Sequence, residues 1–154
     1  MSRGGALSGI LHVLLHMAER EGPVTSDTLA RIMQTNPVVI RRVMAGLRAQ
    51  GYVRSERGHG GGWTLARDLA TITLRDIYEG IGSPPLFAIG NRSEAPDCAV
   101  EQAVNAALDS SRREAETLLL ASFGRITLAD LSADFHRRLA RRCAASSPGG
   151  HHER

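Results

Sequence analysis

The sequence predicts a mainly α-helical fold with a small β wing: a winged helix-turn-helix that is followed by a long helix. Three patterns lead to this prediction. Two short helical patterns meet at a polar break over residues 34–36, a glycine-tipped hairpin pattern follows over 52–66, and a heptad-like apolar repeat runs through 98–122. We therefore expect a winged helix-turn-helix domain over 1–83, a loop over 84–97, two further helices over 98–143 and a disordered tail over 144–154.

The first helix is expected from Leu7 to about Arg20, because leucine and isoleucine recur there at helical spacing and Gly22-Pro23 ends the pattern. His12 and His16 lie four residues apart on one face of this helix, a spacing that two metal ligands can use. No third ligand is in view. We therefore expect a solvated or hydrogen-bonded histidine pair and no metal site.

The helix-turn-helix is expected as one helix over Ser26–Met33 and a second from Pro37 to about Gln50. Asn36 is a favoured N-cap residue, proline suits the first helical position, and Gly51 tolerates the left-handed backbone that ends helices. Apolar residues at i, i+3, i+4 and i+7 predict one buried stripe: Ile40, Val43, Met44 and Leu47. The positions left outside this stripe are Val38, Val39, Arg41, Arg42, Ala45 and Arg48.

A hairpin is expected next, because residues 52–56 and 63–66 have strand composition and Gly58–Gly62 between them must form a turn. Residues 31–67 contain seven arginines and one acid, a charge of +6, whereas the whole chain carries only +3. A winged helix with this charge is expected to bind double-stranded DNA, with its second helix in the major groove. Arg57 and His59 flank the glycine tip, where we expect them to meet a minor groove and its phosphates.

The second half of the chain is expected to supply a dimerisation helix. Thr73-Leu74-Arg75-Asp76 is a capping-box pattern for a short helix, and Asp97 is expected to cap a long helix from Cys98 to about Ser122. Small or apolar residues recur along it at spacings of three and four: Val100, Val104, Leu108, Ser111, Ala115, Leu118 and Ser122. A helix this long cannot bury its stripe on so small a domain, so we expect it to pair with a second subunit. The alternative is packing against the first helix of the same chain.

The last helix is expected to begin at a second capping-box pattern, Thr127-Leu128-Ala129-Asp130. Its apolar face is expected at Leu128, Leu131, Phe135 and Leu139. Arginines crowd its final turns, where cations suit the helix dipole.

This assembled pattern resembles the bacterial Rrf-type transcriptional regulators, which include the iron–sulfur cluster regulator and the nitric-oxide-sensing repressor. The resemblance covers residues 5–143. It is most specific in the wing, where Arg57-Gly58-His59-Gly60-Gly61-Gly62 is followed by Trp63-Thr64-Leu65-Ala66, and it extends to 73–77 and to Thr127–Leu131.

The resemblance implies a homodimer with two helices in major grooves and two wings in minor grooves. It also implies that Asn36, Val38, Val39, Arg41 and Arg42 face bases and phosphates, and that Arg57 and Gly58–Gly62 form the wing. With the positions that the residue pattern itself favours, the candidate DNA-binding residues are Thr25, Asn36, Val38, Val39, Arg41, Arg42, Arg48, Arg57, His59, Gly60, Gly61 and Gly62.

The cysteines depart from the family pattern. Cluster-binding members carry three cysteines in and after the loop that precedes the dimerisation helix, whereas here Cys98 stands alone and Cys143 lies far along the chain. The irons of a cluster need four ligands, so we expect no iron–sulfur cofactor. A cluster shared by Cys98 of two subunits is an alternative without other support. The chain looks like a single-cysteine branch of the family, with residues 84–97 as a sensor-type loop.

Cys98 has two competing interpretations. It stands at the first turn of a helix, where unpaired N–H groups and the helix dipole favour a thiolate that reacts with oxidants or electrophiles. Modification there would change the angle between the two recognition helices and release DNA. The other interpretation is an inert cysteine at a helix start, in which case the signal would be a small molecule bound beneath residues 84–97. Cys143 is expected to be incidental.

Other classes of protein are less well supported. No Ser/His/Asp set, phosphate loop or metal-ligand cluster is present, and Gly58–Gly62 lacks the lysine and the serine or threonine of a Walker loop, so we expect no enzyme. No apolar run of 18 residues exists, which excludes a membrane span, and two cysteines make no secreted disulfide framework, so the cytoplasm is expected. A winged helix that binds protein is the remaining alternative. Repression is the simpler expectation for a small dimer.

Overall fold

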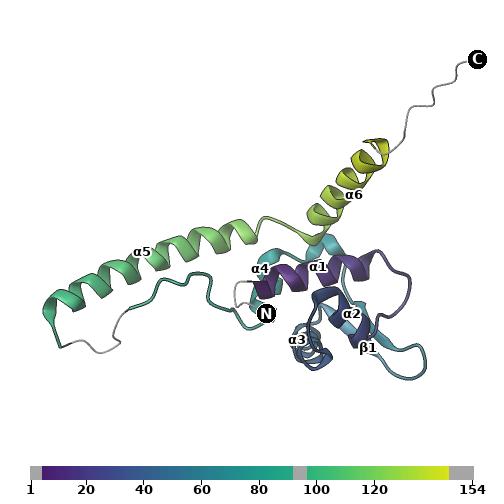
Figure 1. The fold of residues 1–154 in the computed structure, drawn as a ribbon, viewed down its shortest axis with the longest axis horizontal. Coiled ribbons are helices and arrows are strands. Elements are labelled where there is room, and N and C mark those ends of the chain that lie inside the picture. The colour runs from purple at the N-terminus through teal and green to yellow at the C-terminus, as the bar shows by residue number, and fades with distance from the viewer. Residues whose placement is uncertain (1–4, 92–96, 146–154) are drawn as a thin grey trace, which may run out of the picture.

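In the computed structural model, which describes residues 5–91 and 97–145, the chain builds a small winged-helix domain from which two helices lead away (Figure 1). The elements follow in the order α1 (Ala6–Ala18), α2 (Ser26–Met33), α3 (Pro37–Ala49), β1 (Val53–Glu56), β2 (Gly62–Leu65), η2 (Leu69–Thr71), α4 (Leu74–Gly80), α5 (Ala99–Phe123) and α6 (Leu128–Ala145). The predicted fold class, mainly helical with a small β wing, is confirmed.

The helix-turn-helix forms where the sequence predicts it. The Thr25 hydroxyl accepts a hydrogen bond from the N–H of Thr28 at 3.2 Å, and Asn36 Oδ1 accepts one from the N–H of Val38 at 2.8 Å, so both helices begin at a side-chain cap. Gln34 ends α2 with a positive φ of 52°, and Gly51 follows α3 with a φ of 78°. Local signals therefore fix both ends of each helix.

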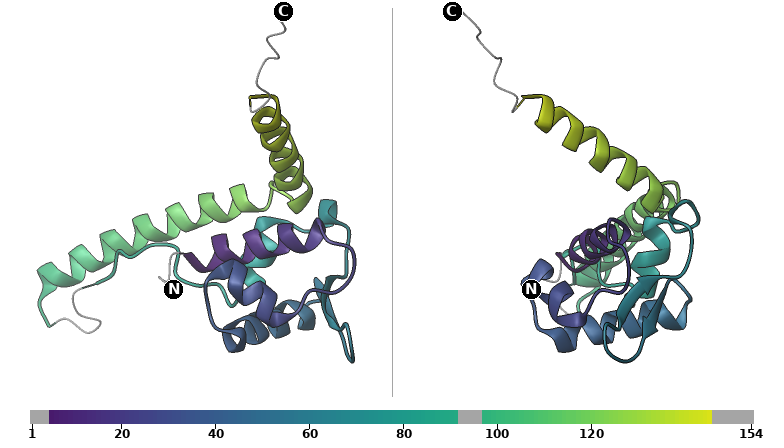
Figure 2. Two further views of the ribbon diagram at one scale, coloured as in Figure 1. Left: turned by 45° about the vertical axis from the view of Figure 1, so that its right-hand side comes forward. Right: turned by 90° about the vertical axis from the view of Figure 1, so that its right-hand side faces the viewer.

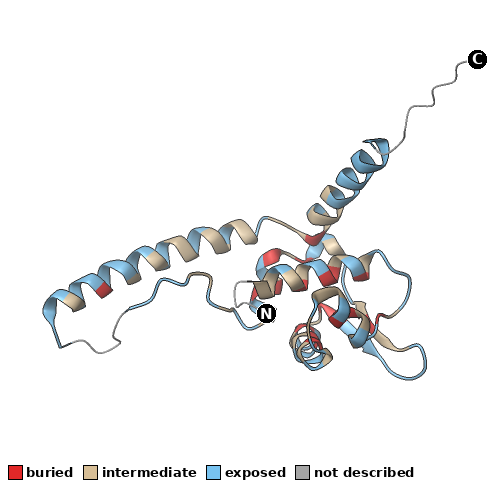
Figure 3. Cartoon of the chain, in the orientation of Figure 1, coloured by how far each residue is buried: buried red, intermediate tan, exposed pale blue. Residues whose placement is uncertain are grey.

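The core lies between α1, the helix-turn-helix, α4 and the start of α6. Its fully buried side chains are Ile10, Val13, Leu14, Leu29, Ile40, Met44, Leu47, Val53, Ile72, Ile77 and Leu128. Burial of each such side chain contributes about 1.5–3 kcal/mol to the stability of the folded state. Of the stripe predicted for α3, Val43 is only half-buried. Figure 3 shows the buried residues gathered in this domain, with α5 and α6 largely exposed.

The wing is tied to the start of α2. Strands β1 and β2 pair antiparallel with Val53 opposite Leu65 and Glu56 opposite Gly62. Trp63 exchanges two backbone hydrogen bonds with Val24, and its indole N–H donates to the Ser26 hydroxyl at 2.9 Å. These contacts join the hairpin to the start of the helix-turn-helix.

Helices α3 and α4 cross closely because glycine stands on both sides of the contact. A Cβ atom at Gly46 would lie 2.9 Å from the carbonyl oxygen of Gly80, and one at Gly80 would lie 2.6 Å from a methyl of Leu47. A side chain at Gly46 would collide with backbone, and one at Gly80 would require the buried Leu47 side chain to shift.

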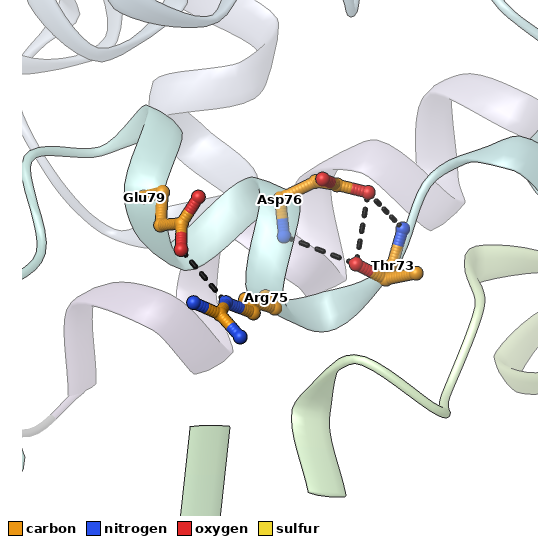
Figure 4. Close-up of polar contacts among 4 residues, drawn as sticks. All are labelled: Thr73, Arg75, Asp76 and Glu79. Atoms are coloured by element: carbon orange, nitrogen blue, oxygen red, sulfur yellow. Dashed lines mark hydrogen bonds and ion pairs between the residues drawn. The ribbon is translucent and has the colours of Figure 1, made fainter. Parts of the chain in front are cut away.

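Both predicted capping boxes form, and they lie side by side. Asp76 accepts hydrogen bonds from the N–H and the hydroxyl of Thr73, each at 2.8 Å, and the Thr73 hydroxyl accepts from the N–H of Asp76 (Figure 4). Thr127 and Asp130 repeat this arrangement at the start of α6. The N–H of Leu74 donates to the carbonyl of Ile126, and that of Leu128 donates to Ile72. This short bridge joins the last helix to the winged-helix domain.

Helix α5 extends away from the domain, as Figures 1 and 2 show. Its N-cap is Cys98, so the expectation that Asp97 caps the helix is wrong: the chain becomes helical one residue later. The C-terminal end of α5 contacts α4, where the rings of Tyr78 and Phe123 lie 6.3 Å apart. The large apolar residues of the predicted stripe are exposed, with Val100 and Leu118 72% and 74% exposed.

Two smaller boundaries differ from the prediction. Helix α4 ends at Gly80, three residues before the predicted end of the winged-helix domain at residue 83, because Ile81 and Gly82 close its last turn. Residues 84–91 form the expected irregular segment, and 92–96 lie outside the described residues. Helix α6 continues to Ala145, so the predicted tail from 144 begins too early, and 146–154 again lie outside. In the part of the chain that is described, every helix is too short or too polar to cross a membrane.

Candidate nucleic-acid interface

The outer face of α3 presents an exposed basic surface. Arg41 and Arg42 are exposed and form no hydrogen bond or ion pair with any described residue. Val38, one turn before them, is 56% exposed. Val39 is half-buried, so of the predicted contact residues on this helix it is the least accessible.

Thr25 and Asn36, the candidate residues that cap α2 and α3, already use part of their side chains in hydrogen bonds. Thr25 accepts from the N–H of Thr28 and donates to the Thr28 hydroxyl at 3.0 Å. Asn36 uses its Oδ1 to cap α3, which leaves its amide N–H groups at the exposed N-terminal end of the helix. Such an end, with its unpaired N–H groups and positive dipole, favours a phosphate.

Arg48 differs from the other predicted arginines because it is already paired. Its guanidinium donates to the Ser55 hydroxyl at 3.1 Å and so connects α3 to β1. Two further arginines of the basic stretch, Arg54 and Arg67, also have partners within the domain. Arg54 donates to Thr64 across the hairpin at 3.1 Å, and Arg67 lies 5.2 Å from the ring centroid of Tyr52. No sequence signal distinguishes these roles, since each depends on pairing between distant residues.

The wing tip is a narrow turn whose side chains are exposed. Arg57, Gly58, His59 and Gly60 are exposed, and Arg57 has no hydrogen-bond or ion-pair partner among the described residues. Gly58 and Gly60 adopt φ values of 95° and 78°, which favour glycine. The tip therefore projects a cation on a narrow turn.

Gly61 and Gly62 are explained by the fold itself. A Cβ atom at Gly61 would collide with the carbonyl group of Glu56, and one at Gly62 would collide with the carbonyl of Val24. Both positions are half-buried, and Gly62 is the first residue of β2 rather than part of the turn. Of the three glycines among the candidate DNA-binding residues, only Gly60 lies on the exposed tip.

Helix α3 and the wing lie on the same side of the domain, away from α6, in the views of Figures 1 and 2. The candidate DNA-binding residues that are exposed, apart from the paired Arg48, are Thr25, Asn36, Val38, Arg41, Arg42, Arg57, His59 and Gly60. We call these eight residues the α3–wing face. Cationic side chains without partners beside a helix N-terminus suit a phosphate backbone with bases between its strands.

The two cysteines lie at the far ends of the long helices. Cys98 is an exposed thiol at the N-cap of α5, and the backbone N–H groups of Glu101 and Val100 lower its pKa below the ordinary value for a thiol. Cys143 is exposed near the end of α6 and forms no disulfide with Cys98. Among the described residues, no three His, Cys, Asp or Glu side chains are arranged to hold a metal ion. His12 and His16 form the expected pair, with their Nε2 atoms 2.9 Å apart.

An apolar groove of about 570 Å³ opens where α5 meets the domain. It is lined by residues of α1, α4, the 84–86 segment and the end of α5, among them Leu7, Leu11, Leu74, Tyr78, Leu119 and Phe123. The groove lies beneath the start of the predicted loop. Helix α5 and the domain therefore share one apolar surface.

Comparison with known proteins identifies the family. The model of the Rrf2 family, described as an iron-dependent transcriptional regulator, matches residues 6–134. The chain is 29% identical over 106 residues to YwnA of Bacillus subtilis (strain 168), which is named as an HTH-type transcriptional regulator, and the match covers 68% of this chain and 77% of YwnA.

Solved structures agree with the fold. A crystal structure of a transcriptional regulator from Lactobacillus plantarum matches with a TM-score of 0.70 and 27% identity, covering 94% of this chain and 99% of that chain. The structure of T. potens IscR matches with a TM-score of 0.60 and 24% identity, covering 97% and 92% of the two chains.

These matches confirm the predicted function class, since the family and the relatives named are transcriptional regulators and not enzymes. The match spans the helix-turn-helix, the wing and the whole of α5. The chain belongs to the Rrf2 family of DNA-binding transcriptional regulators.

Proposed function

We propose that this regulator is a homodimeric repressor that places α3 of each subunit in a major groove and each wing in the adjacent minor groove. The observation that carries the proposal is the α3–wing face, where Arg41, Arg42 and Arg57 are exposed and without protein partners. Exposed arginines of this kind neutralise phosphates, and an N-terminal helix end aimed at DNA positions the side chains that read bases. A regulator of a bacterial type that acts on genomic DNA would work in the cytoplasm.

The second subunit is proposed to cover α5. Val100, Val104, Leu108 and Leu118 repeat along one side of this helix and are between 41% and 74% exposed. Apolar side chains at that spacing are typical of helix pairing. Two α3 helices held by one dimer would read a DNA site with two-fold symmetry. Repression follows from occupancy of a promoter, because a small dimer needs no further contact to block access.

Salt-dependent DNA binding tests this proposal. We expect the full chain to bind a duplex from upstream of its own gene, with an affinity that falls steeply as salt rises. The double variant Arg41→Gln/Arg42→Gln should weaken binding and reduce the slope of log K against log salt by about 1 for each arginine that contacts a phosphate.

A matched control removes the same charge elsewhere. Arg137 and Arg138 on α6 are paired with Asp134 at 3.1 and 2.6 Å, and the variant Arg137→Gln/Arg138→Gln should leave affinity and slope unchanged. Equal losses from both double variants would contradict a role for the α3–wing face. Absence of salt-dependent DNA binding would favour a winged helix that contacts protein.

We further propose that the protein works without an iron–sulfur cluster, although its family is described as iron-dependent. The sulfur ligands available do not fit a cluster within one chain. Cys98 and Cys143 stand at the start of α5 and near the end of α6, and the irons of a cluster need four ligands.

Cys98 is proposed as the sensor instead. Its side chain is exposed and its lowered pKa increases the thiolate fraction, which is the form that reacts with oxidants. In the simplest reaction the thiolate takes one oxygen atom from hydrogen peroxide and becomes a sulfenate, and water leaves. The added group lies at the end of the proposed dimer helix, where it would alter subunit packing and release DNA.

Variants of the two cysteines test the sensor. Wild type and Cys143→Ser should lose DNA affinity on treatment with peroxide and recover it with reductant, whereas Cys98→Ser should bind DNA in both states. If Cys98→Ser still responds to oxidant, the sensor is not Cys98. If wild type is indifferent to oxidant, the signal would be a small ligand, for which the apolar groove beneath residues 84–86 is the place to search.

A further inference from the structure

Val38 is an apolar residue that the fold does not use. It is the second residue of α3 and is 56% exposed, whereas Ile40, Met44 and Leu47 on the opposite side of the helix are fully buried. Valine is a poorer helix former than most residues because its branched side chain loses rotamer freedom. Packing within the domain therefore uses little of this side chain, which is left at the surface of the helix.

The surroundings of Val38 limit what it can contact. Its backbone N–H is already donated to Asn36 Oδ1 at 2.8 Å, so only its two methyl groups remain to meet a partner. Arg41 and Arg42 follow at i+3 and i+4, so they lie on the same side of the helix one turn away. Val38 is thus an apolar spot at the N-terminal end of a basic helix face.

We propose that Val38 contacts the C5-methyl group of a thymine in the operator. The inference rests on the proposed placement of α3 in the major groove. N-terminal residues of a recognition helix meet base edges there, and the thymine methyl is the apolar group that those edges carry. A valine methyl packed against it excludes water from both groups, and a cytosine or a purine at that position offers no such contact.

The neighbouring arginines set the expected sequence around this thymine. Residues three or four apart on a helix have Cβ atoms about 5–6 Å apart, which corresponds to about one or two base-pair steps along the duplex. Arginine pairs with the O6 and N7 atoms of guanine. Each half-site should therefore contain a thymine that Val38 reads and, within about two base pairs, a guanine that faces Arg41 or Arg42.

Removing single methyl groups from the DNA tests the contact directly. The tightest-binding duplex is selected from random sequences with the full chain, and each thymine is then replaced in turn by deoxyuridine, which lacks only the methyl. For wild type, one position in each half-site should weaken binding by about fourfold, the factor expected when one methyl group is left in water.

The matching protein variant completes a double-mutant cycle. Val38→Ala should lose most of the difference between thymine and deoxyuridine duplexes, because both γ-methyl groups of the valine are gone. The control Ile89→Ala, at a residue that is 59% exposed and remote from α3 in the chain, should keep the wild-type sensitivity. Val38→Thr, which keeps the shape and one methyl, should retain part of it and serves if the alanine variant does not fold.

The outcomes separate the inference from the proposed function. If wild type binds the selected duplex but no thymine-to-deoxyuridine change matters, or if Val38→Ala keeps the same sensitive position, Val38 does not read thymine although DNA binding stands. If no duplex is selected at all, the proposed DNA-binding mode itself has failed.

Discussion

His12 and His16 show how one hydrogen bond between two residues responds to pH. Their Nε2 atoms are 2.9 Å apart, so one ring must donate and the other must accept, which is impossible when both are protonated. Burial lowers the pKa of His16 below 6.5, the nearby His12 and Arg20 lower it further, and Glu19 opposes them. Glu19 in turn lies 3.1 Å from His136 of α6, so the pair belongs to the contact between α1 and α6.

We predict that this pair makes the protein less stable in mild acid. Between pH 6.5 and the lower pKa of folded His16, the unfolded chain binds more protons, so the free energy of unfolding falls as pH falls. The effect should be small, about 0.5 kcal/mol or less, because His16 is exposed. Urea denaturation at pH 7.5 and 5.5 should show a smaller difference for His16→Gln than for wild type. Identical differences would mean that another group carries the pH dependence.

At the residue scale, the sequence predicts what local signals determine. Asn36 and Gly51 act through their own neighbours in the chain: Asn36 caps the start of α3 and Gly51 follows its end, as predicted. Arg42 and Arg48 look equivalent in the sequence, yet only Arg48 is paired, because its partner Ser55 is on a strand whose position depends on the whole hairpin. Whether the wing glycines serve the fold or a ligand is hidden for the same reason.

Among the elements, α4 depends on its first turn more than on its length. The helix is short and would be marginal alone, so the Thr73–Asp76 capping box supplies hydrogen bonds that the first N–H groups otherwise lack (Figure 4). Burial raises the pKa of Asp76, but the hydrogen bonds from Thr73 and Tyr52 outweigh this and the pKa is lowered overall. The charged carboxylate is therefore the form that stabilises the helix.

We predict that Asp76→Ala lowers the free energy of unfolding by about 1–2 kcal/mol, the usual cost of a lost cap. The control is Glu79→Ala on the same helix, which removes only a surface ion pair with Arg75 and should cost about 0.5 kcal/mol or less. Both are measured by urea denaturation at pH 7. Because the folded pKa of Asp76 is lowered, its contribution should disappear as pH falls below about 3.8. A deficit that persists unchanged in acid would point to lost packing rather than a lost cap.

The sequence predicts helices that carry their own start signals. It does not predict which of these elements pair when they are distant in the chain. The two capping-box patterns predict where α4 and α6 begin, but nothing in the sequence indicates that Thr73 and Thr127 lie opposite each other. The misplaced cap of α5 has a local cause: Asp97 and Cys98 are adjacent, and aspartate is the more common cap.

At the scale of the whole molecule, the exposure of α5 and its heptad-like pattern both indicate an interface on this helix. The winged-helix domain buries its apolar residues, whereas α5 leads away from it with its stripe uncovered (Figure 3). The sequence predicted this stripe and a need for a partner, but the direction of α5 depends on contacts between distant residues, such as the rings of Tyr78 and Phe123 and the hydrogen bond from Asn91 to Asp109. Exposed apolar side chains along most of a long helix indicate an interface.

We predict that one charge in this stripe separates the subunits. Val104→Glu should convert a dimer to a monomer, because a carboxylate in the centre of a helix pair would be buried without a partner. The control Ala106→Glu adds the same charge two residues away on the opposite side of α5, at an exposed position, and should remain dimeric. Light scattering after size-exclusion chromatography measures the mass of each variant.

DNA binding should follow the oligomeric state. In a dimer the second α3 binds at a high effective concentration once the first is bound, so the monomeric variant should lose about two orders of magnitude or more in affinity for a two-fold symmetric site. Its affinity for a single half-site should be unchanged, because the α3–wing face is intact. A dimeric Val104→Glu, or a wild type that is monomeric and yet binds with full affinity, would assign the stripe of α5 to a different partner.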